Sequence, residues 1–477
     1  MSRRSFVALL NKAPPGFLIT CLLASFILSV LYTRGWFQED VLDTFTCAGQ
    51  AILNGADPYR TEPLRTCELQ KSGGTRFNNS GAVEPAPLPA YALVPFELLS
   101  IVSKKLAHAI FPALLLTAVI LTCLAIAKLT SFSFPGLMLI FIPTTYLNTV
   151  YGENTLFAVA GVALAGLALA RKRYTLAALA VACSMVQPHI GLASCVALFL
   201  WVPETRRTLT VCAVVAAVLS IATIGVERNV EYFRDVLPGQ ALAEVYADDQ
   251  YSLTRMLFWF GFSPASAIRL GTISYVIMAV FGIWLSKKLS DVLKAPEFMA
   301  LLPPVAVLLG GTFVHDIQMS LAIPCAIILA HHSEARKWMS WFAIPLIATI
   351  LGHHWRWFFY LAPFLAAAFI ARRSRSRTVV TSWCAAGAIV IGVLFSSSFF
   401  RQPPSPAATP MPTELLDGGR IASDAWGAYL RSGDTPPGAS VVEWIERIPN
   451  WLGLICILIV ATGQLCRRKQ IAHGSKI

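Results

Sequence analysis

The sequence has few charged residues. Asp, Glu, Lys and Arg make up 13% of its 477 residues, whereas soluble domains carry about 25%. So few charges cannot cover a globular surface, which excludes an ordinary soluble protein. The net charge of +12 does not indicate nucleic-acid binding. The basic residues lie in short clusters between apolar runs, a pattern that sets orientation in membrane proteins.

Three other features are missing. No small-residue cleavage site follows the first apolar run, so residues 17–33 are predicted to form an uncleaved first transmembrane helix. No internal repeat is visible, although carriers commonly have one. No metal-ligand spacing is found either. We therefore expect neither a metal nor a cofactor.

The chain is rich in apolar runs, of which we count 14 from residues 16–33 to 449–466. Several are shorter than the roughly 20 residues of a straight crossing. The prediction is an all-α polytopic membrane protein with about 12–14 transmembrane helices. A catalytic module would span 1–397, with a first outer loop at about 34–107. A second outer loop with a Pro-rich start would span 398–448, and a last helix with a basic cytoplasmic tail 449–477.

Basic clusters test this topology, because cytoplasmic loops carry an excess of Lys and Arg. With a cytoplasmic N-terminus, seven successive inner loops each contain basic residues: Lys128 and the clusters at 171–173, 206–207, 287–294, 336–337, 372–377 and 467–469. The long loops 34–107, 227–263 and 398–448 and the short segment 312–318 then lie outside. Both termini are predicted to be cytoplasmic.

The cysteines outside the apolar runs also lie on the predicted outer side of the membrane. Of 11 cysteines, only Cys47 and Cys67 lie outside the predicted transmembrane runs, and both lie in the first outer loop. An oxidising exterior permits a disulfide between them. The alternative is two free thiols.

Polar residues interrupt the apolar chain at five places, all on the predicted outer side. Ionisable residues at a membrane are costly and usually mark a function or a pairing. Each place also has a structural interpretation: a helix cap at Glu153 and Asn154, a kink at Gln187 to His189, a pair at His315 and Asp316, and a solvated loop at 248–250. Together they predict one polar site on the outer face.

These segments resemble a family. The stretch "CAGQAILNGADPY", preceded by an Asp, is similar to the first-loop signature of polyprenyl-phosphate-sugar-dependent glycosyltransferases of the GT-C fold. "GENTLF", "QPHIG", "DDQYSLTRML" and "GTFVHDIQMSLAIP" resemble later segments of the bacterial alpha-mannosyltransferase group, glycosyltransferase family 87. The resemblance spans roughly residues 36–325. Glu153 stands where the family usually has Gln, and Gln187 where it usually has Lys.

The resemblance implies a function. A sugar, most plausibly a mannose-like hexose, would pass with inversion from a polyprenyl-phosphate donor to a hydroxyl of a glycan or glycolipid. The site would lie on the outer face of a bacterial cytoplasmic membrane, among membrane lipids. A first-loop aspartate, Asp40 or Asp43, would be the general base. The predicted substrate-binding residues are Tyr59, Glu153, Asn154, Gln187, His189, Asp249, Gln250, Ser252, Arg255, His315, Asp316 and Arg356.

The leaving phosphate gains negative charge, so cations should surround it. The candidates are Arg255, His315, His189 and Arg356. Arg255 has a second interpretation as an interfacial anchor, because it precedes the apolar run "MLFWFGF". The alternative to a transferase is a transporter or flippase of a lipid-linked or polar substrate. Long loops on one side favour the enzyme.

The alternating basic clusters generate the first prediction. Reporter domains fused after Arg173, Lys288 and Arg377 should report a cytoplasmic location, and fusions within 398–448 should report the exterior. Alkaline phosphatase and a fluorescent protein distinguish the two sides. One reversed result among the first three fusions would break the topology at that helix.

Overall fold

The computed structural model describes residues 40–72, 83–130, 132–247, 249–332, 337–349, 377–400, 417–433 and 441–474. Within these ranges the fold is helical, with no β-strand beyond two isolated bridges. This confirms the predicted all-α class. The predicted first transmembrane helix, residues 17–33, lies outside the described residues, as does Arg356.

Four described helices are long and apolar enough to cross a membrane by length and composition. They lie within 104–129, 203–244, 264–293 and 444–466. Seven shorter apolar helices accompany them, so the described chain is consistent with a polytopic membrane protein. The count of 12–14 crossings stays a prediction, because the predicted spans 16–33 and 355–371 lie outside the described residues.

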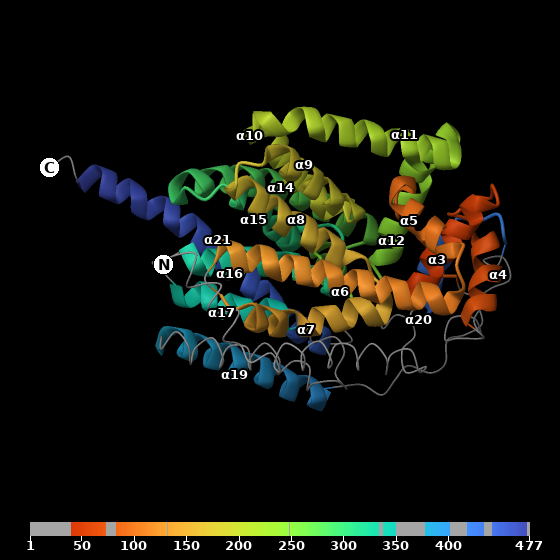
Figure 1. Cartoon of the computed structure of the whole chain (residues 1–477). Helices are drawn as coiled ribbons and strands as arrows, with labels where there is room; N and C mark the ends of the chain where they lie inside the picture. The colour runs from red at the N-terminus through yellow and green to blue at the C-terminus, as the bar shows by residue number, and fades with distance from the viewer. Residues whose placement is uncertain are drawn as a thin grey trace.

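The helices form one bundle (Figure 1). Its first part contains α3 (Asp40–Leu53), α4 (Thr61–Ser72), α5 (Ala90–Ser100), α6 (Lys104–Leu129), α7 (Phe134–Tyr151), α8 (Thr155–Ala170), α9 (Tyr174–Cys183) and α10 (Pro188–Trp201). Its middle contains α11 (Arg206–Glu231), α12 (Leu237–Glu244), α13 (Leu253–Trp259), α14 (Pro264–Leu293) and α15 (Phe298–Gly310). Its last part contains α16 (Ile323–His332), α17 (Lys337–Ala348), α19 (Arg377–Phe400), α20 (Ala422–Gly433) and α21 (Val441–Gly474).

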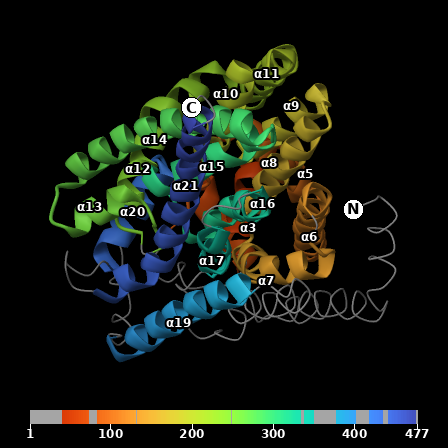
Figure 2. The same cartoon turned by 90° about the vertical axis from the view of Figure 1, so that its left-hand side faces the viewer.

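The elements of the first and last predicted outer loops lie at the same end of the bundle. Helices α3, α4, α5 and α20 gather there, while the C-terminal end of α21 lies at the opposite end (Figure 1). The view from the side in Figure 2 shows α8, α15, α16 and α21 in the middle of the bundle. This arrangement agrees with a chain whose long loops share one side.

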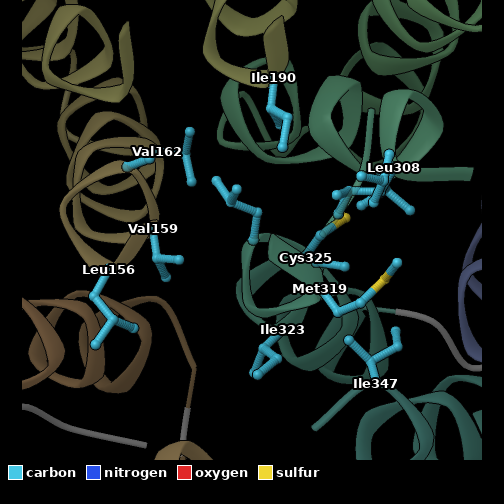
Figure 3. Close-up of a cluster of buried hydrophobic side chains, with 14 of the residues drawn as sticks. Leu156, Val159, Val162, Ile190, Leu308, Met319, Ile323, Cys325 and Ile347 are labelled. Carbon is cyan, nitrogen blue, oxygen red and sulfur yellow. The ribbon is translucent and has the colours of Figure 1, made fainter. Parts of the chain in front are cut away.

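The core lies below that end. Side chains from α8, α10, α15, α16 and α17 meet there, among them Leu156, Val162, Ile190, Leu308 and Ile347 (Figure 3). Burial of such aliphatic side chains is the main stabilising contribution between these helices wherever water is excluded. The short 3₁₀ helix Asp316–Ala322 belongs to this core through Met319. The polar residues before it are therefore fixed to a rigid base.

The helices of the predicted first outer loop pack closely against one another and against the rest of the bundle. A side chain at Gly49 in α3 would lie 2.5 Å from the backbone nitrogen of Glu97 in α5, so only glycine allows these helices to cross. Gly152 ends α7 in the left-handed region, with φ of 72°, against Leu42 of α3. The contact between Gly152 and Leu42 brings the start of α3 beside the loop that carries Glu153.

The predicted disulfide between Cys47 and Cys67 is present and joins α3 to α4. Arg60 adds further ties. It forms ion pairs with Asp57 and Glu231, and its guanidinium also donates to the carbonyl of Gly419. One arginine thus connects the first loop, the end of α11 and the last loop.

The disulfide generates the second prediction. Replacing Cys47 and Cys67 together by serine should lower the unfolding temperature in detergent, because loss of a 20-residue cross-link costs about 3 kcal/mol in the chain-entropy model. Cys466→Ser, at an exposed free cysteine, is the matched control. Equal unfolding temperatures for the double variant and the control would show that the link contributes nothing.

Candidate active site

Two short segments that are far apart in the sequence pair at the outer end of the core. Gln250 and His315 form an isolated antiparallel bridge. The amide of Tyr251 donates to the carbonyl of Val314 at 2.6 Å, and the amide of Asp316 donates to the carbonyl of Asp249 at 3.1 Å. The side-chain oxygen of Gln250 also accepts from the Val314 amide at 3.0 Å. This pairing brings the third and fourth predicted polar segments together.

His315 lies among carboxylates. Its Nδ1 is 2.8 Å from Oδ2 of Asp249, and its Nε2 is 3.5 Å from Oε2 of Glu244. Burial by itself lowers the pKa of His315, but the charges of Asp249 and Glu244 and the hydrogen bond to Asp249 raise it well above its usual range. These carboxylates favour the protonated, positively charged form of the imidazole. It can stabilise a negative charge that develops beside it.

A chain of side-chain amides connects the remaining two segments. The Gln187 amide donates to Oδ1 of Asn154 at 2.6 Å, and the Gln318 amide donates to Oε1 of Gln187 at 3.1 Å. Oε1 of Gln318 accepts from the backbone amide of His315 at 3.0 Å and lies 3.3 Å from Nε2 of His189. Buried amides of this kind fix one another's orientation when each is bonded. Four of the five predicted segments thus form one network, which we call the polar cluster.

Glu153 lies at the edge of the polar cluster. It is half-buried in the loop between α7 and α8, directly after Gly152. Burial, with further contributions from the charges of Asp249 and Asp316, raises the pKa of Glu153 to about 7, although His315 opposes the shift. Carboxyls with such a pKa are typical of functional sites, because they can take or release a proton near neutral pH.

The first-loop acids lie next to this edge, on α3. Both carboxylate oxygens of Asp43 are engaged: Oδ2 lies 2.6 Å from Nζ of Lys104, and Oδ1 lies 2.9 Å from Nε2 of His108. Burial raises the pKa of Asp43, but the bonds to His108 and Lys104 outweigh it and leave the pKa below its ordinary value. Asp40 is the first residue of α3, and its side chain is outside the described part.

Comparison with known proteins finds one similarity. Residues 86–310, just under half of the chain, match the model of glycosyltransferase family 87. This part of the chain is therefore similar to family 87 glycosyltransferases. No curated protein and no solved structure matches the sequence. The matched region contains the segments of Glu153, Gln187 and Gln250, while the first-loop signature and His315 lie outside it.

Three predicted substrate-binding residues have structural partners inside the protein. Tyr59 is buried, donates to the carbonyl of Leu88 at 2.9 Å and packs on the ring of Tyr232. Ser252 caps α13 by accepting from the amide of Arg255. Arg255 is buried, donates to the carbonyl of Val245 at 2.7 Å and lies over the ring of Phe258. These contacts give all three side chains structural partners, while their predicted role in substrate binding stays a prediction.

Sequence reasoning missed several residues of the candidate site. Glu244, Lys104, His108 and Arg447 were not predicted, and each contacts a predicted residue. The signal for Lys104 was the adjacent basic pair that it forms with Lys105. Within the described residues, no three His, Cys, Asp or Glu side chains are grouped to hold a metal ion. The expected independence of a metal stays a prediction.

Glu153 generates the third prediction. Because its pKa rises from 4.5 to about 7 on folding, the folded state binds more protons than the unfolded state between these values. Stability should therefore fall as pH rises through this window. Glu153→Gln removes the titration, so its unfolding temperature should exceed that of the native protein at pH 8 and approach it at pH 5.

Thermal unfolding at pH 5, 6.5 and 8 measures this difference. Asp291→Asn, remote from the polar cluster on α14, is the control and should not show the same trend. A Glu153→Gln variant that is less stable than the native protein at pH 8 would contradict the assignment of a costly buried carboxylate.

Proposed function

We propose that this glycosyltransferase transfers a hexose, mannose-like, from a polyprenyl-phosphate donor to a hydroxyl of a glycan or glycolipid. The proposed location is the outer face of a bacterial cytoplasmic membrane. The observation that carries the proposal is the polar cluster, which gathers acids, amides and a charged imidazole at the end of the bundle where the long loops meet. The family 87 match, which includes the segments of Glu153, Gln187 and Gln250, supports it.

The proposed reaction is a single displacement with inversion. The acceptor oxygen attacks the anomeric carbon, its proton passes to a carboxylate, and the bond between the anomeric carbon and the phosphate oxygen breaks. Polyprenyl phosphate leaves with the bonding electrons. One base on the face opposite the leaving group is sufficient, in contrast to the close carboxylate pair of retaining glycosidases.

Asp40 is the better candidate for the base of this proposal. Asp43 bonds to Lys104 and His108, and its lowered pKa makes it a weak proton acceptor. Asp40 starts the same helix three residues earlier. In this proposal Asp43 keeps α3 in register with α6, while Asp40 receives the proton. The Leu42–Gly152 contact supports a position of this helix end beside the polar cluster.

His315 is the better candidate for the group that stabilises the leaving phosphate. The neighbouring carboxylates raise its pKa and favour the charged form, with Asp249 at Nδ1 and Glu244 and Gln250 at Nε2. Arg255 is less suited, because its guanidinium is buried against the Val245 carbonyl and the Phe258 ring. A positioned cation facing developing negative charge lowers the barrier to transfer.

The fourth prediction tests this function. Purified protein in detergent should transfer radiolabelled mannose from polyprenyl-phosphate mannose to a lipid extract of the cell envelope. Asp40→Asn should fold normally and lower the rate by about 100-fold or more, because a general base contributes on that scale. Asp43→Asn should lower the unfolding temperature instead, because it leaves Lys104 and His108 without their carboxylate.

Asp291→Asn is the control for both variants. Full activity in both Asp40→Asn and Asp43→Asn would exclude a first-loop base. Movement of intact donor into sealed vesicles, without transfer of its sugar, would favour the transporter interpretation and refute the proposed reaction.

A further inference from the structure

The last outer loop reaches the polar cluster from beyond the region that matches family 87. This loop supplies α20 and the start of α21, whereas the match ends at residue 310. Its residues did not enter the sequence prediction of the site. Two separate sets of contacts connect it to the groups around His315.

The first set of contacts positions the carboxylate of Glu244. Helix α20 packs on α12 so closely that a side chain at Gly427 would lie 3.2 Å from the Cα of Ala243. The hydroxyl of Ser423 donates to Oε1 of Gln240 at 2.9 Å, and the Gln240 amide donates to Oε1 of Glu244 at 2.5 Å. The other oxygen of Glu244 faces Gln250 and His315. The loop thus orients a carboxylate of the cluster through one intermediate amide.

The second set holds the segment 249–251. The Nε–H of Arg447 donates to the carbonyl of Gln250 at 2.7 Å, and the indole N–H of Trp451 donates to the carbonyl of Tyr251 at 3.0 Å. The Arg447 guanidinium lies between aromatic rings, 5.4 Å from the centroid of Tyr251 and 5.0 Å from that of Trp444. Arg447 is buried. A charged donor enclosed in this way makes a strong and directional hydrogen bond.

Both donors bond to backbone carbonyls of the segment, at Gln250 and Tyr251. The Tyr251 amide bonds in turn to Val314, and the Gln250 side chain bonds to the Val314 amide. The segment that carries Asp249 and Gln250 is therefore held from both sides, by the loop before the 3₁₀ helix and by α21. Helix α21 itself is anchored along α14, α15 and α17, as Figure 2 shows.

We propose that Arg447 and Trp451 are positioning residues of the active site, which hold Asp249 and Gln250 against His315 so that the donor phosphate meets a fixed imidazole. The inference rests on the proposed function. In this role the C-terminal part of the chain is a component of the site rather than an appended anchor. Small displacements of such a constellation are expected to cost much of the rate, because preorganised charge acts only at the correct geometry.

The test uses Arg447→Met and Trp451→Phe in the full-length protein. The matched controls lie at the predicted cytoplasmic end. Arg206 also donates to backbone carbonyls and lies over the ring of Phe199, and Trp201 donates its indole N–H to the carbonyl of Ile283. Arg206→Met and Trp201→Phe thus remove the same chemistry from a place far from the cluster.

Two measurements decide the proposal. Hydrogen exchange of the amides in 249–251 and 314–316 should accelerate in Arg447→Met and not in Arg206→Met. The transfer rate at saturating donor should fall about tenfold in Arg447→Met and about threefold in Trp451→Phe, the sizes expected for a charged and a neutral hydrogen bond. In a cycle with His315→Gln, the combined loss should be smaller than the product of the single losses.

The contrary results are distinct. Unchanged exchange in the two segments, or rates within twofold of the native protein in both variants, would overturn the positioning role. The positioning role would also be overturned if the rate losses of Arg447→Met and His315→Gln simply multiply in the double variant. Such independence would indicate only a general loss of stability. If Arg447→Met fails to accumulate, Trp451→Phe decides alone, because it keeps the ring and removes one donor. If the native protein transfers no sugar, the proposed function fails, and the exchange measurement still judges the inference.

Discussion

The pairing of residues 249–251 with residues 314–316 is the interaction on which the polar cluster depends. In a helical bundle that excludes water, an unbonded backbone group costs several kcal/mol. These two segments satisfy one another's amides and carbonyls where the chain is not helical. His315 and Asp249 meet only because this short pairing fixes both. The Gln318 side chain extends it to the segment of Gln187 by accepting the His315 amide.

Acids are gathered around that pairing at a cost. Glu153 and Asp316 both have a pKa raised to about 7, with burial as the largest cause. A fold selected only for stability has no reason to place carboxyls where their charged form is disfavoured. The pKa of His315 is raised because the surrounding carboxylates favour its charged form, and a positive imidazole offsets part of the repulsion among these acids. Several raised pKa values in one place are characteristic of sites that handle charge or protons.

Outside the cluster, polar side chains join the loops in addition to the hydrophobic core that the loops share with the bundle. Arg60 connects the first loop to α11 and to the last loop, and the backbone of Thr61 donates to the carbonyl of Arg420. The Cys47–Cys67 disulfide shortens the first loop. These ties explain why the G-x-D-P-Y stretch contains buried or bonded residues: Asp57 accepts from the Tyr59 amide and pairs with Arg60. Its residues hold the loops around the cluster.

The sequence by itself determined the class of the protein and the composition of its site. Low charge and repeated apolar runs dictate a helical membrane protein, because a helix satisfies its own backbone without water. Polar residues in apolar surroundings marked Glu153, Gln187, Gln250 and His315 before any contact was known, because such residues are too costly to occur without a function or a pairing. The two cysteines of the predicted first outer loop likewise indicated a disulfide, which joins Cys47 to Cys67.

Only the tertiary structure decided how these residues act together. Arg255 and Tyr59 have the residue types of a binding site, yet their neighbours are backbone carbonyls and aromatic rings. Asp43 and Asp40 could not be separated by spacing, and the cations beside Asp43 come from α6, 61 and 65 residues further along the chain. Arg447 and Ser423 contact the cluster across about 200 residues. Sequence patterns report local period and composition, whereas these contacts depend on which helix ends meet in space.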